Sequence, residues 1–130
     1  MRVVSPDEIA SYALAKPGAW PDSPWENDRV AKVGPGERGK IFAFLGTDTV
    51  GVKCGPGREG AADEWLDRYP DDASVMAYIG RGGWNTLRLG GAIPDDELLE
   101  AVDVSYELVV AKLPKKLRPG GDGRWASRSR

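Results

Sequence analysis

The chain contains no histidine and only one cysteine, Cys54. Without histidine, neither a Ser–His nor a Cys–His nucleophile pair can form. Zinc sites usually take histidine or several cysteines, so that type of site is excluded as well. A single cysteine allows no internal disulfide, and a free thiol is typical of the cytoplasm. We therefore expect a cytoplasmic protein that is not an enzyme and that needs no metal and no cofactor.

Long apolar runs are also missing, since the longest are as short as Ile41 to Leu45 and Leu108 to Ala111. A membrane span needs about 20 mostly apolar residues, so we expect no membrane contact. The first six residues lack the basic and then apolar pattern of a secretory signal. A length of 130 residues suits one domain. We predict a single domain over residues 1–119 and a mobile basic tail over residues 120–130, where three glycines disfavour a helix.

Charge is spread unevenly along the chain, whose net charge is −2. Residues 115–130 carry six basic side chains against one acidic side chain, Asp122. The first 114 residues are therefore acidic. This asymmetry differs from the composition of a wholly basic nucleic-acid binder.

Three helices are predicted from their end signals and apolar spacing. The first begins in Ser5-Pro6-Asp7-Glu8, a capping box with proline at the first helical position, and ends at Lys16-Pro17-Gly18. The second covers Ala61 to Tyr69, before Pro70. The third begins at Pro94 and ends at Pro114. Its spacing of three and four predicts a buried stripe in contact with Phe42 or Phe44, made of Leu99, Val102, Tyr106, Val109 and Leu113.

Five strands are predicted between the helices: Arg29–Val33, Ile41–Leu45, Thr49–Lys53, Val75–Ile79 and Trp84–Leu89. Ile41–Leu45 is apolar on both faces, which predicts a central strand covered on both sides. The stretch 19–28 contains two prolines and is read as irregular, pinned to the core by Trp20 and Trp25. The order α-β-β-β-α-β-β-α predicts an α+β fold. Its five-stranded sheet is mainly antiparallel and has the helices on one face.

Several segments together resemble a known family. They are the stretch VAKVGPGERGKIFAFLG at Val30–Gly46, the triplet Trp84-Asn85-Thr86, and SYELVVAKLPKK at Ser105–Lys116. Over residues 5–119 the chain resembles the MmcQ/YjbR family of small bacterial proteins. The resemblance implies a CyaY-like fold with two protruding hairpins, a "double wing", and DNA binding through them.

A first candidate surface consists of the two wings. Arg38 and Lys40 belong to the first hairpin loop, and Arg81 lies at the tip of the second. Glycine-rich tips can approach a phosphate backbone, which lysine and arginine neutralise. With the basic residues at the end of the last helix, they predict weakly sequence-specific DNA binding. Those residues are Lys112, Lys115, Lys116 and Arg118. The alternative is that both loops are ordinary solvated hairpins.

A second candidate is one face of the sheet. Alternation along a strand places Trp84, Thr86 and Arg88 on one face, with Lys32 and Lys53 as possible neighbours. An aromatic ring among cations is typical of single-stranded nucleic-acid binding. The alternative interpretation makes Trp84 a core residue that is covered by the stem of Arg88.

A third candidate is an acidic stripe on the last helix, formed by Asp96, Glu100, Asp103 and Glu107 at spacings of four, three and four. A basic protein partner would offset their mutual repulsion. The stripe therefore carries the alternative function, a protein-interaction or chaperone-like adaptor domain without nucleic-acid binding. Such a stripe is also typical of a plain solvated face. Cys54 is interpreted as a packed residue, because no base accompanies it.

Overall fold

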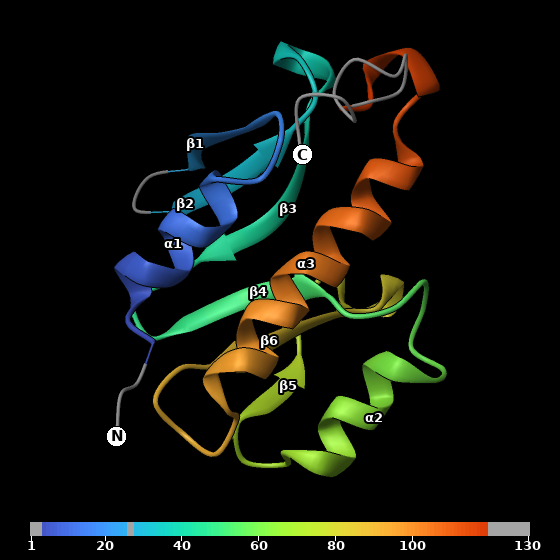
Figure 1. The fold of residues 1–130 in the computed structure, drawn as a ribbon. Helices are drawn as coiled ribbons and strands as arrows, with labels where there is room; N and C mark the ends of the chain where they lie inside the picture. The colour runs from blue at the N-terminus through green and yellow to red at the C-terminus, as the bar shows by residue number, and fades with distance from the viewer. Residues whose placement is uncertain (1–3, 26–27, 120–130) are drawn as a thin grey trace.

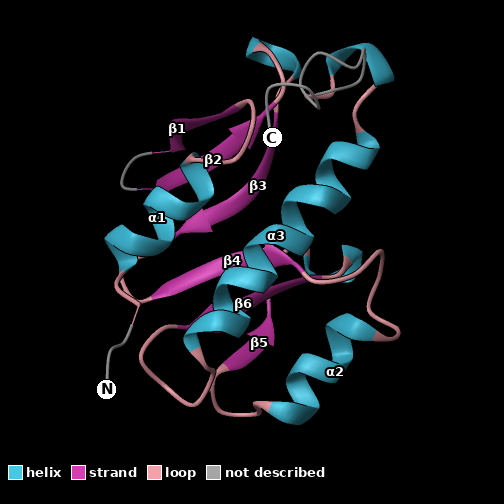
Figure 2. Cartoon of the chain, viewed as in Figure 1, coloured by secondary structure: helices cyan, strands magenta, loops and turns pink. Residues whose placement is uncertain are grey.

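The computed structural model describes residues 4–25 and 28–119. It is an α+β structure in which a twisted sheet is covered by helices on one side (Figures 1 and 2). The helices are α1 (Pro6–Leu14), α2 (Ala61–Arg68) and α3 (Asp95–Lys112), with short 3₁₀ turns η1 (Gly36–Arg38), η2 (Gly80–Gly82) and η3 (Lys115–Leu117). The strands are β1 (Ala19–Trp25), β2 (Asp28–Val33), β3 (Lys40–Leu45), β4 (Thr49–Lys53), β5 (Ala73–Val75) and β6 (Trp84–Arg88).

The sheet has six strands in the order β1-β2-β3-β4-β6-β5, and every neighbouring pair is antiparallel. The prediction of five strands is wrong because β1 was read as irregular. Its prolines Pro21 and Pro24 disfavour a central strand, but β1 lies at the edge of the sheet, where proline is tolerated. Trp20 fastens this strand, since its Nε1 donates a hydrogen bond to the carbonyl of Gly34 at 2.8 Å. The side chain of Trp25 lies outside the described residues.

The strand predicted over Val75–Ile79 is displaced, since β5 ends at Val75. The chain turns after it, and Tyr78 takes a left-handed conformation with φ of 68°. A residue with positive φ cannot continue a strand. The apolar run that suggested a strand is instead an exposed loop, in which Tyr78 and Ile79 face solvent.

The predicted capping box is present at the start of α1: Ser5 Oγ accepts from the Glu8 N–H, and Glu8 Oε1 accepts from the Ser5 N–H. The stripe predicted on α3 is confirmed in part. Val102, Val109 and Leu113 are buried, whereas Leu99 and Tyr106 are only partly buried. The fully buried residue of the first turn is Leu98. The buried side of α3 therefore also includes Leu98, Ala101 and Ser105.

Strand β3 is central, as predicted, but helices cover only one of its faces. Its pairing with β2 shifts by one residue, because Ala31 pairs with Ala43 while Lys32 pairs with Ile41. Phe42 is the extra residue of this bulge, and its ring meets Tyr106 of α3 edge-on at 5.2 Å. Phe44 lies on the opposite face and is only partly buried. The bulge thus turns Phe42 toward α3, while Phe44 on the open face is partly covered by the ring of Trp84.

The mobile tail predicted over residues 120–130 lies outside the described residues. Within the described residues, no helix has the length and apolar character needed to cross a membrane.

Candidate nucleic-acid interface

The first hairpin loop and the end of α3 are packed together. A Cβ atom placed on Gly34 would lie 3.3 Å from both terminal methyl groups of Leu113. Figure 1 shows the turn after β2 and the red end of α3 side by side at one end of the molecule. Five exposed basic residues belong to these two segments and form what we call the basic end: Arg38, Lys40, Lys112, Lys115 and Lys116. Within residues 34–40 and 112–118, Glu37 is the only acidic side chain.

Arg118, also predicted to contact phosphates, has a structural role. Its Nε donates to the carbonyl of Leu113 at 2.8 Å, and its Nη2 donates to that of Ala111 at 2.9 Å. These carbonyls lie at the C-terminal end of α3, where a positive charge complements the helix dipole. We therefore assign Arg118 to capping α3.

The second hairpin loop is packed against the body and is not a flexible, protruding tip. Gly83 has φ of +95°, and a Cβ atom there would lie 2.2 Å from the carbonyl oxygen of Gly55. Arg58 Nη1 donates to the carbonyls of Gly80 and Trp84 at 2.9 and 3.0 Å. Arg81 is exposed on this loop, as predicted. Sequence reasoning missed Arg58, because only the folded loop brings its partners within reach.

Lys53 fixes the same loop, since its Nζ donates to the carbonyl of Gly82. Burial lowers the pKa of Lys53 below its ordinary value, and the positive charge of Lys112 lowers it further. Arg88 lies away from this group, because it pairs with Thr49 at the other end of β4 while Lys53 pairs with Trp84.

The open face of the sheet, opposite α1 and α3, carries the residues predicted to share a face. Cross-strand pairing places Trp84 with Lys53, Thr86 with Gly51, and Arg88 with Thr49. The ring of Trp84 meets that of Phe44 edge-on at 5.6 Å. Both rings are partly buried, so Trp84 is neither a full core residue nor fully exposed.

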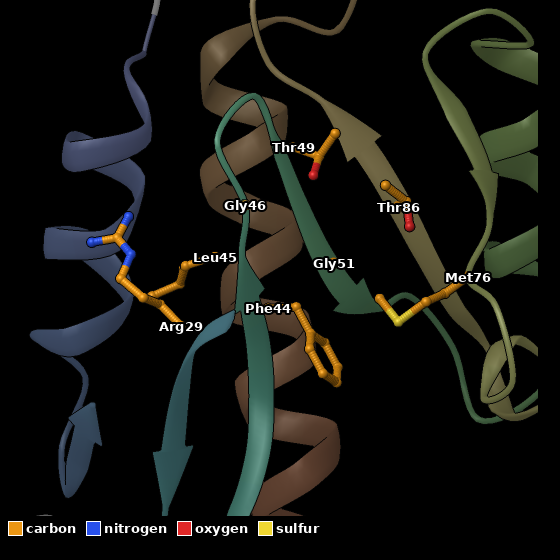
Figure 3. A pocket seen from close by; sticks show the side chains of 8 residues that line it. All are labelled: Arg29, Phe44, Leu45, Gly46, Thr49, Gly51, Met76 and Thr86. Carbon is orange, nitrogen blue, oxygen red and sulfur yellow. The ribbon is translucent and has the colours of Figure 1, made fainter. Parts of the chain in front are cut away.

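A hollow of about 250 Å³ opens on this face (Figure 3). Its lining includes Arg29, Phe44, Thr49, Gly51, Met76 and Thr86. Gly51 lets Met76 pack closely on the strand, since a Cβ atom there would lie 2.1 Å from Met76 Cε and 3.2 Å from Phe44 Cβ. Figure 3 shows Phe44, Met76 and Thr86 around Gly51, with Arg29 beyond Gly46 and Leu45.

Lys32, the other predicted cation of this face, has partners of its own. Its Nζ lies 3.2 Å from Asp22 Oδ2 and 5.0 Å from the ring centroid of Trp20. Cross-strand pairing of Trp20 with Lys32 places both at the β1 side of the open face. We infer that Lys32 mainly holds the edge strand.

The acidic stripe is not a uniform surface. Asp103 forms an ion pair with Lys16 and accepts hydrogen bonds from the Tyr12 hydroxyl at 2.9 and 3.0 Å. Burial raises the pKa of Tyr12, and the bond to Asp103 raises it further. Asp96, Glu100 and Glu107 are exposed. Repulsion along the stripe is thus relieved by Lys16, which follows the end of α1 and which the sequence of α3 alone could not indicate.

Cys54 is buried, and its burial raises the pKa of the thiol to about 11. It contributes to the wall of a cleft of about 410 Å³ between α2 and α3, whose lining also includes Trp65, Arg68, Glu97 and Val104. Arg68 is engaged there by Glu97 and Tyr69. A thiol with a raised pKa is a poor nucleophile, which agrees with a packing role.

The comparisons with known proteins agree with this structure. A sequence model of the YjbR family matches residues 14–108. The chain belongs to the YjbR family. Relatives named "Uncharacterized protein YjbR" from Escherichia coli K12 and O157:H7 are each 27% identical over 117 residues, which is 85% of this chain and 92% of the relative. The crystal structure of Deinococcus radiodurans protein DR2400, whose domain is described as DUF419, superposes with a TM-score of 0.78 at 23% identity. That match covers 91% of this chain and 88% of the other. This YjbR chain therefore shares its fold with that protein.

Proposed function

We propose that this YjbR protein binds DNA through phosphate contacts made by the basic end. The observation that supports the proposal is the packing of Gly34 on Leu113, which joins two basic segments far apart in the sequence. Exposed lysine and arginine side chains are suited to neutralising phosphates, and the five of the basic end outnumber its one carboxylate, Glu37. Such contacts position a protein on the backbone without reading bases, so binding is weakly sequence-specific.

The charge distribution supports the same proposal despite a net charge of −2. The first turn of α3 carries Asp95, Asp96 and Glu97, whereas its last turn carries Lys112. The acidic first turn and the basic last turn therefore lie at opposite ends of an 18-residue helix, about 27 Å apart at 1.5 Å per residue. That separation exceeds the Debye length of about 8 Å at physiological salt, so the carboxylates of the first turn are screened from the basic end, and Glu107 is the acidic residue of α3 nearest to it in sequence.

The acidic stripe gives the alternative, a protein-interaction domain, weaker support. One of its four members, Asp103, is already engaged by Lys16 and Tyr12. A basic partner would have to compete with that contact or bind through Asp96, Glu100 and Glu107 alone. The DNA proposal involves no catalytic step and no cofactor.

Fluorescence anisotropy with a labelled oligonucleotide at low ionic strength tests the proposal. Lys115→Gln with Lys116→Gln removes two charges from the basic end and should weaken binding of every sequence to a similar degree. The matched control is Ser11→Glu with Thr47→Glu, which changes the net charge equally at exposed positions elsewhere. Equal loss in both variants would show that only net charge matters. Failure of the wild-type chain to bind any oligonucleotide would remove the proposal.

A further inference from the structure

The open face of the sheet has a chemistry that phosphate binding at the basic end does not use. Along β6 it presents Trp84, Thr86 and Arg88 in succession, and Thr86 lies in the hollow between the other two. Among the described residues that line the hollow, Arg29 is the only charged one, and none is a carboxylate. The surroundings therefore favour a ligand that combines a flat apolar group with negative charge.

The residues that line the hollow combine apolar side chains with two hydroxyls. Phe44 and Met76 form its walls, and the methyl group of Met76 lies against Gly51, in the place that a side chain there would take. The hydroxyls of Thr49 and Thr86 lie among these apolar groups and can serve as hydrogen-bond donors or acceptors. Flat apolar walls with a few hydrogen-bonding groups are what an unstacked base requires.

The neighbouring loop adds an aromatic side chain. Tyr78 is fully exposed, follows Met76 by two residues and is held at φ of 68°. A positive φ in a residue with a side chain is strained, and such strain gathers at functional sites. The exposed ring lies three residues before Arg81, which is also exposed, so the loop offers a surface for stacking and a cation.

The sheet edges argue against a peptide partner that binds by strand addition. At one edge, β1 carries Pro21 and Pro24, and at the other, β5 has only three residues. Prolines and short strands are devices that block the pairing of a further strand. A partner is therefore directed to the open face rather than to the edges.

We infer that the open face binds single-stranded nucleic acid, with one unstacked base in the hollow at Gly51 and Thr86 and a phosphate at Arg88. In a duplex the bases are stacked and paired, so none can enter a recessed hollow on a sheet face. The inference rests on the proposed function, because the basic end supplies the attraction to phosphates. It adds that the preferred form of nucleic acid is single-stranded and that its bases are contacted.

The test compares two labelled strands of equal length and charge, one of thymidines and one abasic, in anisotropy titrations with the full chain. We expect the thymidine strand to bind at least about fivefold more tightly, since one stacked base contributes at least that much. A duplex of the same length should bind more weakly than the thymidine strand. Equal affinities for the thymidine and abasic strands, or a preference for the duplex, would overturn the inference and leave the proposed function standing.

Two variants locate the base contact. Gly51→Val displaces the Met76 side chain, whose Cε lies where the new Cβ would be, and so reshapes the hollow, whereas Met76→Glu places a carboxylate at its wall. Both should bring the ratio between the strands close to one, and Gly51→Val should leave binding of the abasic strand unchanged. Gly57→Ala, at a position with open space around it, is the control and should keep the preference. Lys115→Gln with Lys116→Gln should weaken both strands equally. A preference that survives both hollow variants would contradict the assigned site, and the absence of binding to either strand would remove the proposed function as well.

Discussion

The hydroxyl of Ser105 donates a hydrogen bond to the carbonyl of Phe42, with 2.6 Å between the two oxygens. The same hydroxyl accepts the N–H of Lys53 at 2.8 Å. Ala43 and Val52 form the last pair between β3 and β4 at this end, and Phe42 directly precedes Ala43 while Lys53 directly follows Val52. Ser105 of α3 therefore takes the place of a ladder bond where the two strands separate at the bulge.

Replacing Ser105 with alanine should lower the free energy of unfolding by about 2–4 kcal/mol. The change leaves a buried carbonyl and a buried N–H without their partner, and each such group costs about 1–3 kcal/mol. Urea denaturation measures the effect, with Ser11→Ala on the exposed side of α1 as control. A loss below about 1 kcal/mol would mean that β3 and β4 close on each other without the hydroxyl.

Two adjacent leucines of α3 should differ in their contribution to stability. Leu98 is fully buried, whereas Leu99 is only partly buried. We expect Leu98→Ala to cost about 2–5 kcal/mol and Leu99→Ala distinctly less, because the cost follows the packed volume that is lost. Urea denaturation of both variants checks this order. A larger cost for Leu99→Ala would instead place Leu99 on the buried side of α3, as the sequence spacing predicts.

The thiol of Cys54 should react slowly with a disulfide reagent in the folded protein. Burial raises its pKa to about 11, so little thiolate exists at pH 8. Reaction with 5,5′-dithiobis(2-nitrobenzoate), followed by absorbance, should be much faster in urea, where the thiol is exposed. Equal rates in the two conditions would contradict the burial of Cys54.

The ammonium group of Lys53 should titrate below its ordinary pKa of 10.5, chiefly because it is buried and secondly because Lys112 is near. Lys112→Gln should raise the pKa of Lys53 part of the way back, as measured by NMR of its Cε and Nζ nuclei. In the window between the lowered native pKa and 10.5, the unfolded chain binds more protons at this group. Taken alone, Lys53 therefore makes the free energy of unfolding rise with pH in that window. A pKa of Lys53 that is unchanged in Lys112→Gln would refute the coupling between them.

Local signals in the sequence were sufficient for the capping box of Ser5 and Glu8, the position of β4 and the strand β3. They failed where tertiary context decides. The prolines of β1 are compatible with a strand only because β1 lies at an edge, and edge position is a property of the whole sheet. The turn at Tyr78 follows from backbone geometry that its residue type does not favour.

In the candidate site, too, local patterns were predictable and long-range contacts were not. The alternation of Trp84, Thr86 and Arg88 was correct, because period two needs only a strand. The other contacts were not predictable from local sequence. Gly34 packs on Leu113 and Asp103 pairs with Lys16 across long stretches of the chain, and Arg118 folds back onto the end of α3. A CyaY-like fold, the division into residues 1–119 and 120–130, and the cytoplasmic location stay predictions.

The salt dependence of DNA affinity tests the central claim most directly. The affinity of the full chain for a labelled single strand is measured between about 20 and 200 mM salt and plotted as log K against log salt concentration. Each neutralised phosphate contributes about −0.7 to the slope, so contacts by the five residues of the basic end predict a slope of about −3.5. Lys115→Gln with Lys116→Gln should reduce its magnitude by about 1.4, and Ser11→Glu with Thr47→Glu should leave it unchanged. A slope near zero, or the same slope in all three proteins, would contradict binding through the basic end.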